Sequence, residues 1–291
     1  MKGKLFFSGL ILSFLALNFA KAQNIQFEDV AFKAALLSAS PENWIARDTD
    51  GYPTSIDTNG DGEISQTEAL NVYQLDINKT QDITSINGIE YFTNLIHLSC
   101  NALSMLKNLD LSKNINLQYL DLNRTGIQTL DVSRNINLEG LALGSTGIKT
   151  LDVSKNINLK YLGLNSTGIQ TLNVSKNNDL EWLALGSTGI KTLDVSRNIK
   201  LTRLDLYGCV GLTSLYMKNG VKKYFTEKFY NFWGTNLNYI CCNEDKVDEV
   251  EKYMQDLATR HALADGWQFS NLTITSDCEA GGTKEASNPN P

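Results

Sequence analysis

The sequence has few of the residues on which several functional classes depend. Among its 291 residues there are four prolines and two histidines, His97 and His261. Acidic residues outnumber basic ones by 32 to 26, so no basic stripe is available for phosphates and no nucleic-acid partner is expected. No arrangement of serine or cysteine with histidine and aspartate, no phosphate-binding loop and no catalytic carboxylate pair is evident. We therefore do not expect an enzyme.

Long apolar runs are also scarce, and the one that exists lies at the N-terminus. Lys2 and Lys4 precede an apolar run over residues 5–19, and Ala20-Lys21-Ala22 has the form of a signal-peptidase site. The run is shorter than the about 20 residues that a membrane span needs. Residues 1–22 are therefore predicted to be a cleaved secretory signal peptide rather than a membrane anchor. The mature protein, with no transmembrane segment, is expected to be secreted or on the cell surface.

The sequence is instead rich in a 21-residue repeat. The units follow the pattern LxxLxLxxTGIxxLxVSxN with small departures, and they begin at Leu117, Leu138, Leu159, Leu180 and Leu201. A period of this length with LxxLxL at its head is the signature of a leucine-rich repeat solenoid, in which stacked coils share one core. The predicted fold class is an α/β solenoid with 21-residue coils, short parallel strands on a concave face, a helical N-terminal cap and a disulfide-stapled C-terminal cap.

Alternation within a unit predicts which side chains form the core. Leu120 and Leu122 should point inward while Tyr119 and Asp121 point outward, and Leu130 begins a second alternation that predicts a strand on the opposite side. Two polar columns are interpreted as structural. These columns are Thr125, Thr146, Thr167 and Thr188, and Asn135, Asn156, Asn177 and Asn198.

The units indicate duplication of a two-coil block of 42 residues. Coils 138–158 and 180–200 differ at three positions, and the one drastic change is Gly140 in the first against Trp182 in the second. This change lies on the outward face of the inner strand, where a binding surface would diversify.

The other parts of the chain are assigned by their position relative to the repeats, which should span residues 72–217. Residues 23–71 form the N-terminal cap, with a helix over 27–40 that places Val30, Ala34 and Leu37 on one face. Residues 218–278 should hold a basic, aromatic insertion, a last inner strand around Tyr239 and the C-terminal cap, with a helix over 245–262. Residues 279–291 are predicted to be a disordered tail.

The N-terminal cap contains a calcium-type loop at residues 57–68, DTNGDGEISQTE. It matches D-x-[DN]-x-[DN]-G-x5-E at every fixed position, with Gly62 at the sharp turn. Oxygen ligands at these spacings suit Ca²⁺, whose expected role is structural. The alternative is an acidic turn without metal. The candidate ligands are Asp57, Asn59, Asp61, Glu63, Ser65 and Glu68.

Five cysteines are present, and export would permit a disulfide. We favour Cys241–Cys278 with Cys242 inward, and Cys242–Cys278 remains the alternative because spacing alone does not choose between them. Cys100 is expected to be a free core thiol.

The candidate ligand-binding residues lie at the third, fifth and seventh positions of the coils. Aromatic side chains together with arginine are the composition of binding hot spots, and small Gly and Ala residues beside them should leave room for a partner. Scattered surface aromatics are the alternative interpretation. The candidates are Tyr119, Asp121, Tyr161, Trp182, Arg203, Asp205 and Tyr207.

Several segments together resemble a known family. FEDVAFKAALL, DTNGDGEIS, ITSINGIEYFTNLIHLSC, the LDVSKN units and NLNYIC are similar to the internalin-like leucine-rich repeat proteins secreted by bacteria, and the 21-residue unit is similar to that of internalin J-type proteins. The resemblance runs from Phe27 to Cys278. It departs from the family at the inner strands, where many relatives carry cysteine and this chain keeps only Cys100. The resemblance implies extracellular adhesion or protein binding without catalysis.

The sequence therefore predicts a binding module whose partner is a protein on a host or neighbouring cell surface. Two alternatives remain open. Stacked aromatic side chains could hold a sugar ring, which would make the chain a glycan-binding module. A structural, self-associating surface protein would instead bind only copies of itself.

Overall fold

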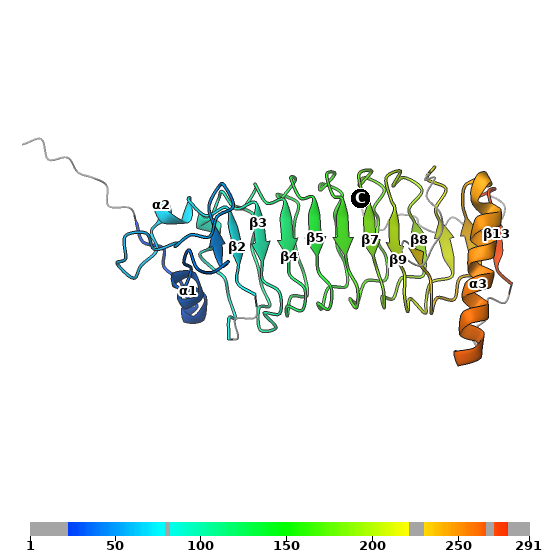
Figure 1. Ribbon diagram of the computed structural model, residues 1–291, viewed down its shortest axis with the longest axis horizontal. Helices are drawn as coiled ribbons and strands as arrows, with labels where there is room; N and C mark the ends of the chain where they lie inside the picture. Colours follow the sequence, from blue (N-terminus) through cyan, green and yellow to red (C-terminus); the bar gives the residue numbers. More distant parts are fainter. Residues whose placement is uncertain (1–22, 79–81, 221–229, 266–270, 279–291) are drawn as a thin grey trace, which may run out of the picture.

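The computed structural model describes residues 23–78, 82–220, 230–265 and 271–278. A nine-stranded sheet, ordered β1-β2-β3-β4-β5-β6-β7-β9-β11, runs along a solenoid, and a four-stranded sheet, ordered β13-β12-β10-β8, lies towards its C-terminal end (Figure 1). The predicted leucine-rich repeat solenoid is thereby confirmed. The predicted signal peptide and tail lie outside the described residues. Within those ranges, no helix combines the length and apolarity that crossing a membrane requires.

The nine-stranded sheet, here called the long sheet, is built from one short strand per coil. Every pairing in it is parallel except that between β1 and β2, which is antiparallel. The strands are β1 (Ala46–Arg47), β2 (Gln74–Asp76), β3 (His97–Ser99), β4 (Tyr119–Asp121), β5 (Gly140–Ala142), β6 (Tyr161–Gly163), β7 (Trp182–Ala184), β9 (Arg203–Asp205) and β11 (Tyr230–Asn231).

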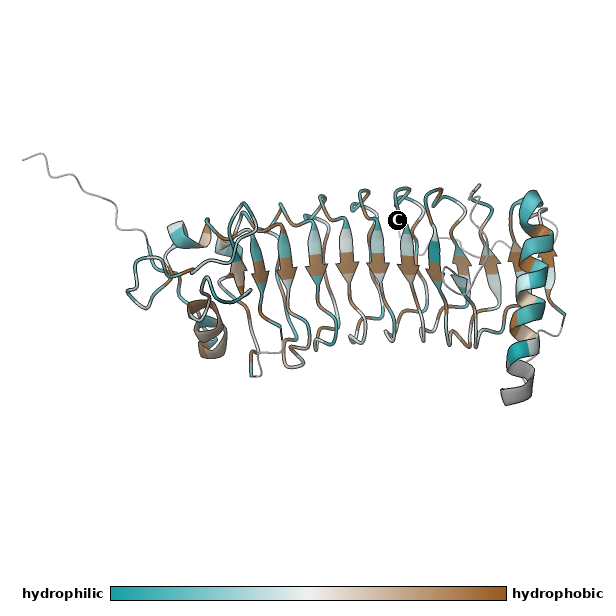
Figure 2. Ribbon diagram, viewed as in Figure 1, coloured by the Kyte–Doolittle hydropathy of each residue, from teal (hydrophilic) through white to brown (hydrophobic). Residues whose placement is uncertain are grey.

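The repeat period sets the register of the long sheet. Leu120 pairs with Leu141 and Leu141 with Leu162, so equivalent positions stack along the solenoid. These central leucines are at most 2% exposed and form a continuous apolar band across the strands (Figure 2). One coil cannot bury its own leucines, and stacking removes them from water.

The asparagine column joins each coil to the one before it. The Asn156 amide donates to the Val132 carbonyl at 3.0 Å and to the Asn135 carbonyl at 2.8 Å. Buried carbonyls need such partners, so this column stabilises the turn between coils. The column is fully buried and is one residue longer than predicted: Asn114, Asn135, Asn156, Asn177 and Asn198.

The threonine column acts within each coil. Thr125 donates its hydroxyl to the Leu122 carbonyl at 2.7 Å, and Thr146 and Thr167 make the equivalent bonds in the next two coils. Thr188 instead contacts the Cys209 sulfur at 3.4 Å, at the point where cysteine replaces the threonine. The predicted structural role of both columns agrees with these contacts.

The N-terminal cap is held to the first coil by Asp29. This residue caps α1 (Val30–Leu37) by accepting from the Phe32 N–H, and its other oxygen accepts from Thr84 and from the Ser85 N–H. The predicted helix face was wrong at Val30, which is 80% exposed, and at Ala34, which is also exposed. Phe32 and its neighbours Ala35 and Leu36 face the core instead, because the Asp29 bonds fix the rotation of the helix. Helix α2 (Gln66–Ala69) and a 3₁₀ turn (Ile89–Tyr91) complete this end.

The C-terminal end differs from the prediction in its strands. Tyr239 does not lie on an inner strand: β12 (Tyr239–Cys241) pairs with β10 (Ser214–Tyr216) in the four-stranded sheet on the other side of the coil. The inner position is taken by β11, from the predicted insertion. Back strands begin at β8 (Thr192–Asp194), and residues 130–132 form none.

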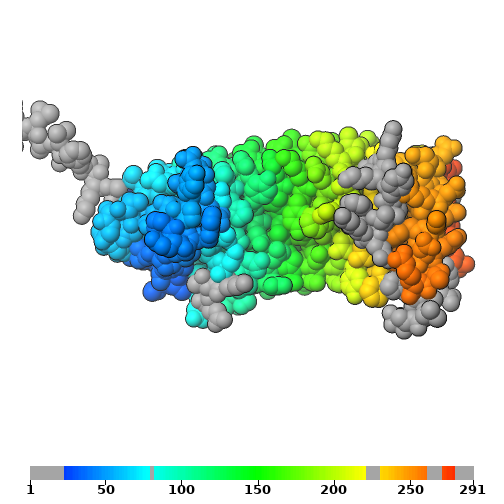
Figure 3. Space-filling view, in the orientation of Figure 1, coloured from blue at the N-terminus to red at the C-terminus, as the bar shows by residue number. Residues whose placement is uncertain are grey.

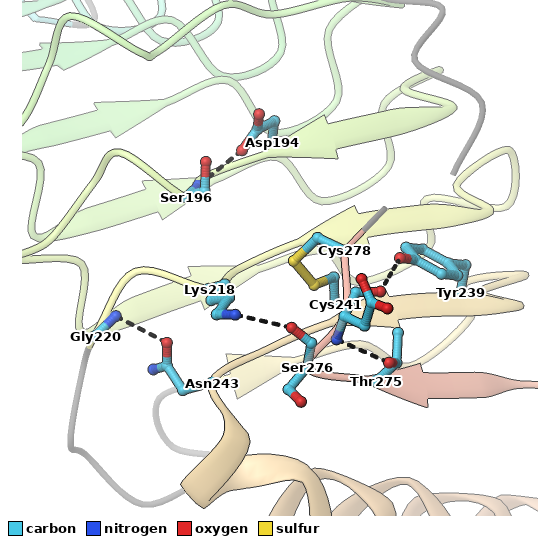
Figure 4. The surroundings of a disulfide bond; sticks show 11 residues. Asp194, Ser196, Lys218, Gly220, Tyr239, Cys241, Asn243, Thr275, Ser276 and Cys278 are labelled. Atoms are coloured by element: carbon cyan, nitrogen blue, oxygen red, sulfur yellow. Dashed lines mark hydrogen bonds between the residues drawn. A yellow bond between two sulfur atoms is a disulfide. The ribbon is translucent and has the colours of Figure 1, made fainter. Parts of the chain in front are cut away.

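The predicted Cys241–Cys278 disulfide is present and fastens the segment that follows β13 to β12 (Figure 4). It lies just after β13 (Thr273–Thr275), where Lys218 also donates to the Ser276 carbonyl at 2.9 Å. A 3₁₀ turn (Glu244–Lys246) leads into α3 (Val247–Asp265), which covers the end of the solenoid as the predicted cap helix should. Cys100 and Cys242 are buried free thiols, as expected.

Candidate binding surface

The outward side chains of the long sheet form a surface that we call the long-sheet face, which is the concave face of the prediction. It runs from the N-terminal cap towards α3, and Figure 3 shows the molecule as one continuous elongated body over that length. The predicted ligand-binding residues all belong to strands of this sheet or to the turn after β9. They are Tyr119 and Asp121 on β4, Tyr161 on β6, Trp182 on β7, Arg203 and Asp205 on β9, and Tyr207 in the turn.

Aromatic rings gather at the C-terminal half of this face. The Tyr161 and Trp182 ring centroids are 4.8 Å apart, and the Arg203 guanidinium carbon lies 5.2 Å from the Trp182 centroid. Tyr207 meets Trp233 edge to face at 5.1 Å. Trp182 is 40% exposed and Tyr207 is 43% exposed, so both rings are open to a partner. We call these five residues the Trp182 cluster.

Sequence reasoning missed Trp233 because its segment was taken as an insertion between coils. Tyr230 pairs with Leu204 and Asn231 with Asp205, which aligns this segment with the inner strands. The available signal was alternation, since Tyr230 and Phe232 are buried while the residues between and after them face outward. Trp44 was missed as well; it is 62% exposed and stacks with Arg47 at the N-terminal end of the same sheet.

The small residues of the face do not leave the open space that was predicted. A Cβ placed on Gly140 would lie 2.8 Å from the Tyr119 ring, and one on Gly163 would lie 2.2 Å from the Tyr161 hydroxyl. The two tyrosine rings therefore lie across these glycines, Tyr119 on the next coil and Tyr161 on its own strand. The glycines allow the rings to lie flat against the sheet. Burial raises the pKa of Tyr161 accordingly.

Two arginines stack on tryptophan rings, but their polar environments differ. Arg47, 5.1 Å from Trp44, donates to Gln74 Oε1 at 2.6 Å and pairs with Asp76 at 3.3 Å. Arg203 has no carboxylate within ion-pair distance in the described part of the chain. Its guanidinium is thus oriented by the ring while its N–H groups stay available to a ligand.

Tyr119 is held in the N-terminal half of the face by a polar contact. Its hydroxyl donates to Glu139 Oε2 at 3.0 Å, and Lys160 donates to the same oxygen at 2.8 Å. The hydrogen bond to the carboxylate raises the pKa of Tyr119, and burial and the Glu139 charge add to that effect. Tyr119 is therefore fixed in place, and Asp121 lies two residues further along the same strand.

The calcium-type loop turns its first carboxylates inwards onto its own backbone. Asp57 Oδ2 accepts from the Gly62 N–H at 2.9 Å, and Gly62 has the positive φ of +78° that the sharp turn requires. Asn59 accepts from the Asp61 N–H, and Asp61 accepts from the Glu63 N–H.

The end of the loop is used for internal contacts. Glu68 accepts from Thr58 and from the Asn59 N–H through one oxygen and from Ser65 through the other. Burial alone would raise the pKa of Glu68, but the bonds from Ser65 and Thr58 outweigh it and lower the pKa. Ser65 caps α2, and the Glu63 side chain pairs with Lys33 at 2.7 Å.

The oxygen donors and the backbone turn of the loop suit a hard cation, but its side chains do not converge on one point. Its donors are all oxygens, and the turn at Gly62 is formed. Nowhere among residues 23–78 and the other described ranges, however, do three His, Cys, Asp or Glu side chains come together to hold a metal ion.

Comparison with known proteins gives structural similarity alone. No family model matches the sequence, and no curated protein matches it. Among solved structures, the functional domain of InlJ from Listeria monocytogenes is 24% identical, over 76% of this chain and 53% of that one, with a TM-score of 0.47. This chain thus spans about half of that structure.

Two further structures have similar statistics. Internalin C2 from Listeria monocytogenes is 18% identical over 75% of this chain and 94% of that one, with a TM-score of 0.42. The Arabidopsis receptor kinase HAESA, solved with the peptide hormone IDA and the co-receptor SERK1, is 15% identical over 60% of this chain and 38% of that one, with a TM-score of 0.45. Internalins and other leucine-rich repeat proteins are therefore the structural neighbours of this chain.

Proposed function

We propose that this chain is an extracellular, non-catalytic module that binds a partner protein through the long-sheet face. The observation that carries the proposal is the Trp182 cluster, in which four aromatic rings, two of them exposed, lie on the sheet beside an arginine that has no ion-pair partner among the described residues. Tryptophan, tyrosine and arginine are the residues that dominate binding free energy in protein interfaces. Because each strand is fixed by its neighbours, these side chains need little reorganisation on binding.

The partner that we propose is a protein on a host or neighbouring cell surface. Two features support an external location: the disulfide between Cys241 and Cys278, and the signal-type sequence of residues 1–22. The cytosol keeps thiols reduced, so a structural disulfide is typical of proteins outside the cell.

The proposal is tested by affinity capture from surface extracts in millimolar calcium, followed by binding of the purified partner. The bait begins at residue 23 and runs to the end of the chain. The test variant changes Tyr161, Trp182, Arg203 and Tyr207 to alanine, and should weaken binding about 100-fold or more. The control changes four exposed isoleucines that lie in the turns before the strands: Ile115, Ile136, Ile157 and Ile199.

A partner that binds the test variant as tightly as the unchanged chain would rule out the Trp182 cluster. Loss of binding in the isoleucine control instead would move the interface to the edge of the coils. Capture of further copies of the same chain would support the self-associating alternative.

We propose in addition that residues 57–68 bind Ca²⁺ and that the ion has a structural role. Asp57, Asn59, Asp61, Ser65 and Glu68 would supply side-chain oxygens and Glu63 its carbonyl. This requires Glu68 to exchange N–H and O–H donors for the ion, which is feasible because its carboxylate is kept ionised by those donors.

Thermal unfolding in calcium and in chelator tests the calcium proposal. Calcium at 100 times its Kd should stabilise the fold by about 2.7 kcal/mol. Asp57→Asn should abolish this shift, since the loop pattern requires a carboxylate at its first position, whereas it accepts asparagine at the third and fifth. Asp50→Asn, an exposed aspartate outside the loop, is the matched control and should retain the shift. An unfolding temperature that is equal in calcium and chelator would refute the proposal.

A further inference from the structure

The Trp182 cluster contains two adjacent, mutually tilted aromatic rings, Tyr161 and Trp182, with polar side chains beside them. Tyr161 lies across Gly163, so its ring is parallel to the strand rather than projecting from it. Trp182 meets this ring at an interplanar angle of 54°, and Arg203 covers one end of the indole. The C–H groups of a six-membered ring ligand could rest on such a surface.

The charges beside this surface balance. Arg203 contributes one positive charge, and Asp205, two residues along β9 and on the same side of the strand, contributes one negative charge. Asp205 Oδ1 accepts from the Tyr207 N–H at 3.1 Å, whereas Oδ2 has no hydrogen-bond partner within the described residues. Within the described residues, a ligand therefore meets N–H donors of Arg203 and one carboxylate oxygen of Asp205 that have no other polar partner, and the two charges cancel.

Gly186 lies where polar groups of Asn165, Asp205 and Tyr207 come close together. A Cβ placed on Gly186 would lie 3.2 Å from the Tyr207 carbonyl oxygen, 3.4 Å from Asn165 Oδ1 and 3.5 Å from Asp205 Oδ2. Asn165 Oδ1 already accepts from the Gly186 N–H at 2.6 Å, and its Nδ2 has no partner in the part of the chain that the structure describes. The absence of a side chain at position 186 thus lets the Asn165 amide and the Asp205 carboxylate lie close to each other on the long-sheet face.

From these features we infer that Tyr161, Trp182, Arg203, Asp205 and Asn165 form a subsite for a neutral hexose or N-acetylhexosamine unit of a glycan. The ring would stack on Tyr161 and Trp182, and its hydroxyls would accept from Arg203 and Asn165 and donate to Asp205. Because the charges of Arg203 and Asp205 balance, neither an anionic nor a cationic sugar gains a net attraction, whereas the hydroxyls of a neutral sugar can both accept from Arg203 and donate to Asp205. The inference rests on the proposed function of the long-sheet face in binding a partner, and it implies that this partner carries a glycan.

The test uses the chain from residue 23 onward and an array of neutral oligosaccharides of glucose, galactose, mannose and N-acetylglucosamine, with oligogalacturonate as the acidic arm. Binders are then titrated by calorimetry. Trp182→Gly is the main variant, because it makes coil 180–200 more similar to coil 138–158, which is part of the same fold. It should weaken binding about tenfold or more. Tyr52→Ala, which removes an exposed ring in the N-terminal cap, should change nothing.

Arg203→Gln and Asp205→Asn test the two charged groups of the subsite. Each should weaken binding of the same neutral sugar while leaving the unfolding temperature nearly unchanged. The inference is overturned if no neutral oligosaccharide binds, if only oligogalacturonate binds, or if Trp182→Gly binds neutral sugars as well as the unchanged chain. The experiment also distinguishes failure of the sugar subsite from failure of the proposed protein-binding function. A protein partner whose Trp182-dependent capture survives enzymatic removal of its glycans would keep that function and refute the sugar subsite.

Discussion

The two halves of the regular repeat, residues 117–158 and 159–200, are near copies that differ where they face solvent. The first half has Tyr119, Asp121 and Gly140 where the second has Tyr161, Gly163 and Trp182. The core positions agree throughout: the central leucines and the asparagine of each coil are buried in both halves. Duplication has therefore kept the scaffold and changed the surface.

Two substitutions explain why the tyrosines lie differently. Asp121 occupies the strand position beside Tyr119, so that ring leans over the next coil onto Gly140. In the second half Trp182 fills the position on the next coil, and Gly163 leaves room on the same strand, so Tyr161 lies there. One half presents a tyrosine hydrogen-bonded to Glu139, and the other presents two rings in contact at a tilt of 54°. The comparison shows how few changes convert a scaffold surface into a candidate binding site.

The largest expected effect tests whether equivalent buried residues contribute equally to the stability of the two halves. Asn156→Ala should lower the free energy of unfolding by about 2 kcal/mol, because it removes two buried hydrogen bonds and leaves the carbonyls of Val132 and Asn135 with their backbone donors alone. Asn198→Ala, which removes the equivalent bonds to Val174 and Asn177, should cost the same within about 0.5 kcal/mol. Urea unfolding followed by circular dichroism measures both. Clearly unequal losses would show that the copies are not equivalent inside.

The interior is also what the sequence predicted best. The period of 21 residues determines the register, so the inward leucines and the polar columns follow from the repeat alone. The Cys241–Cys278 disulfide was favoured correctly over the Cys242 alternative, because Cys242 faces the core.

Prediction from the sequence failed where the repeat stops and where a side chain can pack against more than one neighbouring residue. The assignment of Tyr239 to an inner strand was wrong because β11 lies within a segment without the repeat pattern. The helix face at Val30 was wrong because the Asp29 contacts to Thr84 and Ser85 are distant in sequence and set the rotation of α1. The direction in which Tyr119 and Tyr161 lean depends on residues of the adjacent coil and strand, which periodicity does not weigh.

An intermediate effect is expected when the surface of the second half is built into the first. Gly140→Trp alone should cost about 1 kcal/mol, because its side chain begins 2.8 Å from the Tyr119 ring. Asp121→Gly clears the strand position into which that ring can move. The double variant should therefore be more stable than the sum of the single changes by at least about 0.5 kcal/mol. Additive losses in the double-mutant cycle would contradict this account of the two tyrosines.

The smallest expected effect separates the causes that raise the two tyrosine pKa values. Glu139→Gln should lower the pKa of Tyr119, since the hydrogen bond to the carboxylate is the largest cause of its shift. The same change should leave the pKa of Tyr161 unchanged, because that pKa is raised mainly by burial. Because the folded-state pKa of Tyr119 is raised, its stabilising contribution is present below the ordinary tyrosine pKa of about 10 and is lost as the pH rises through the folded value. Carbon-13 labelling of tyrosine Cζ, with NMR titration between neutral and alkaline pH, follows each ring. Equal shifts at both rings would mean that Glu139 acts on the whole face, and the distinction between the halves would then be one of packing alone.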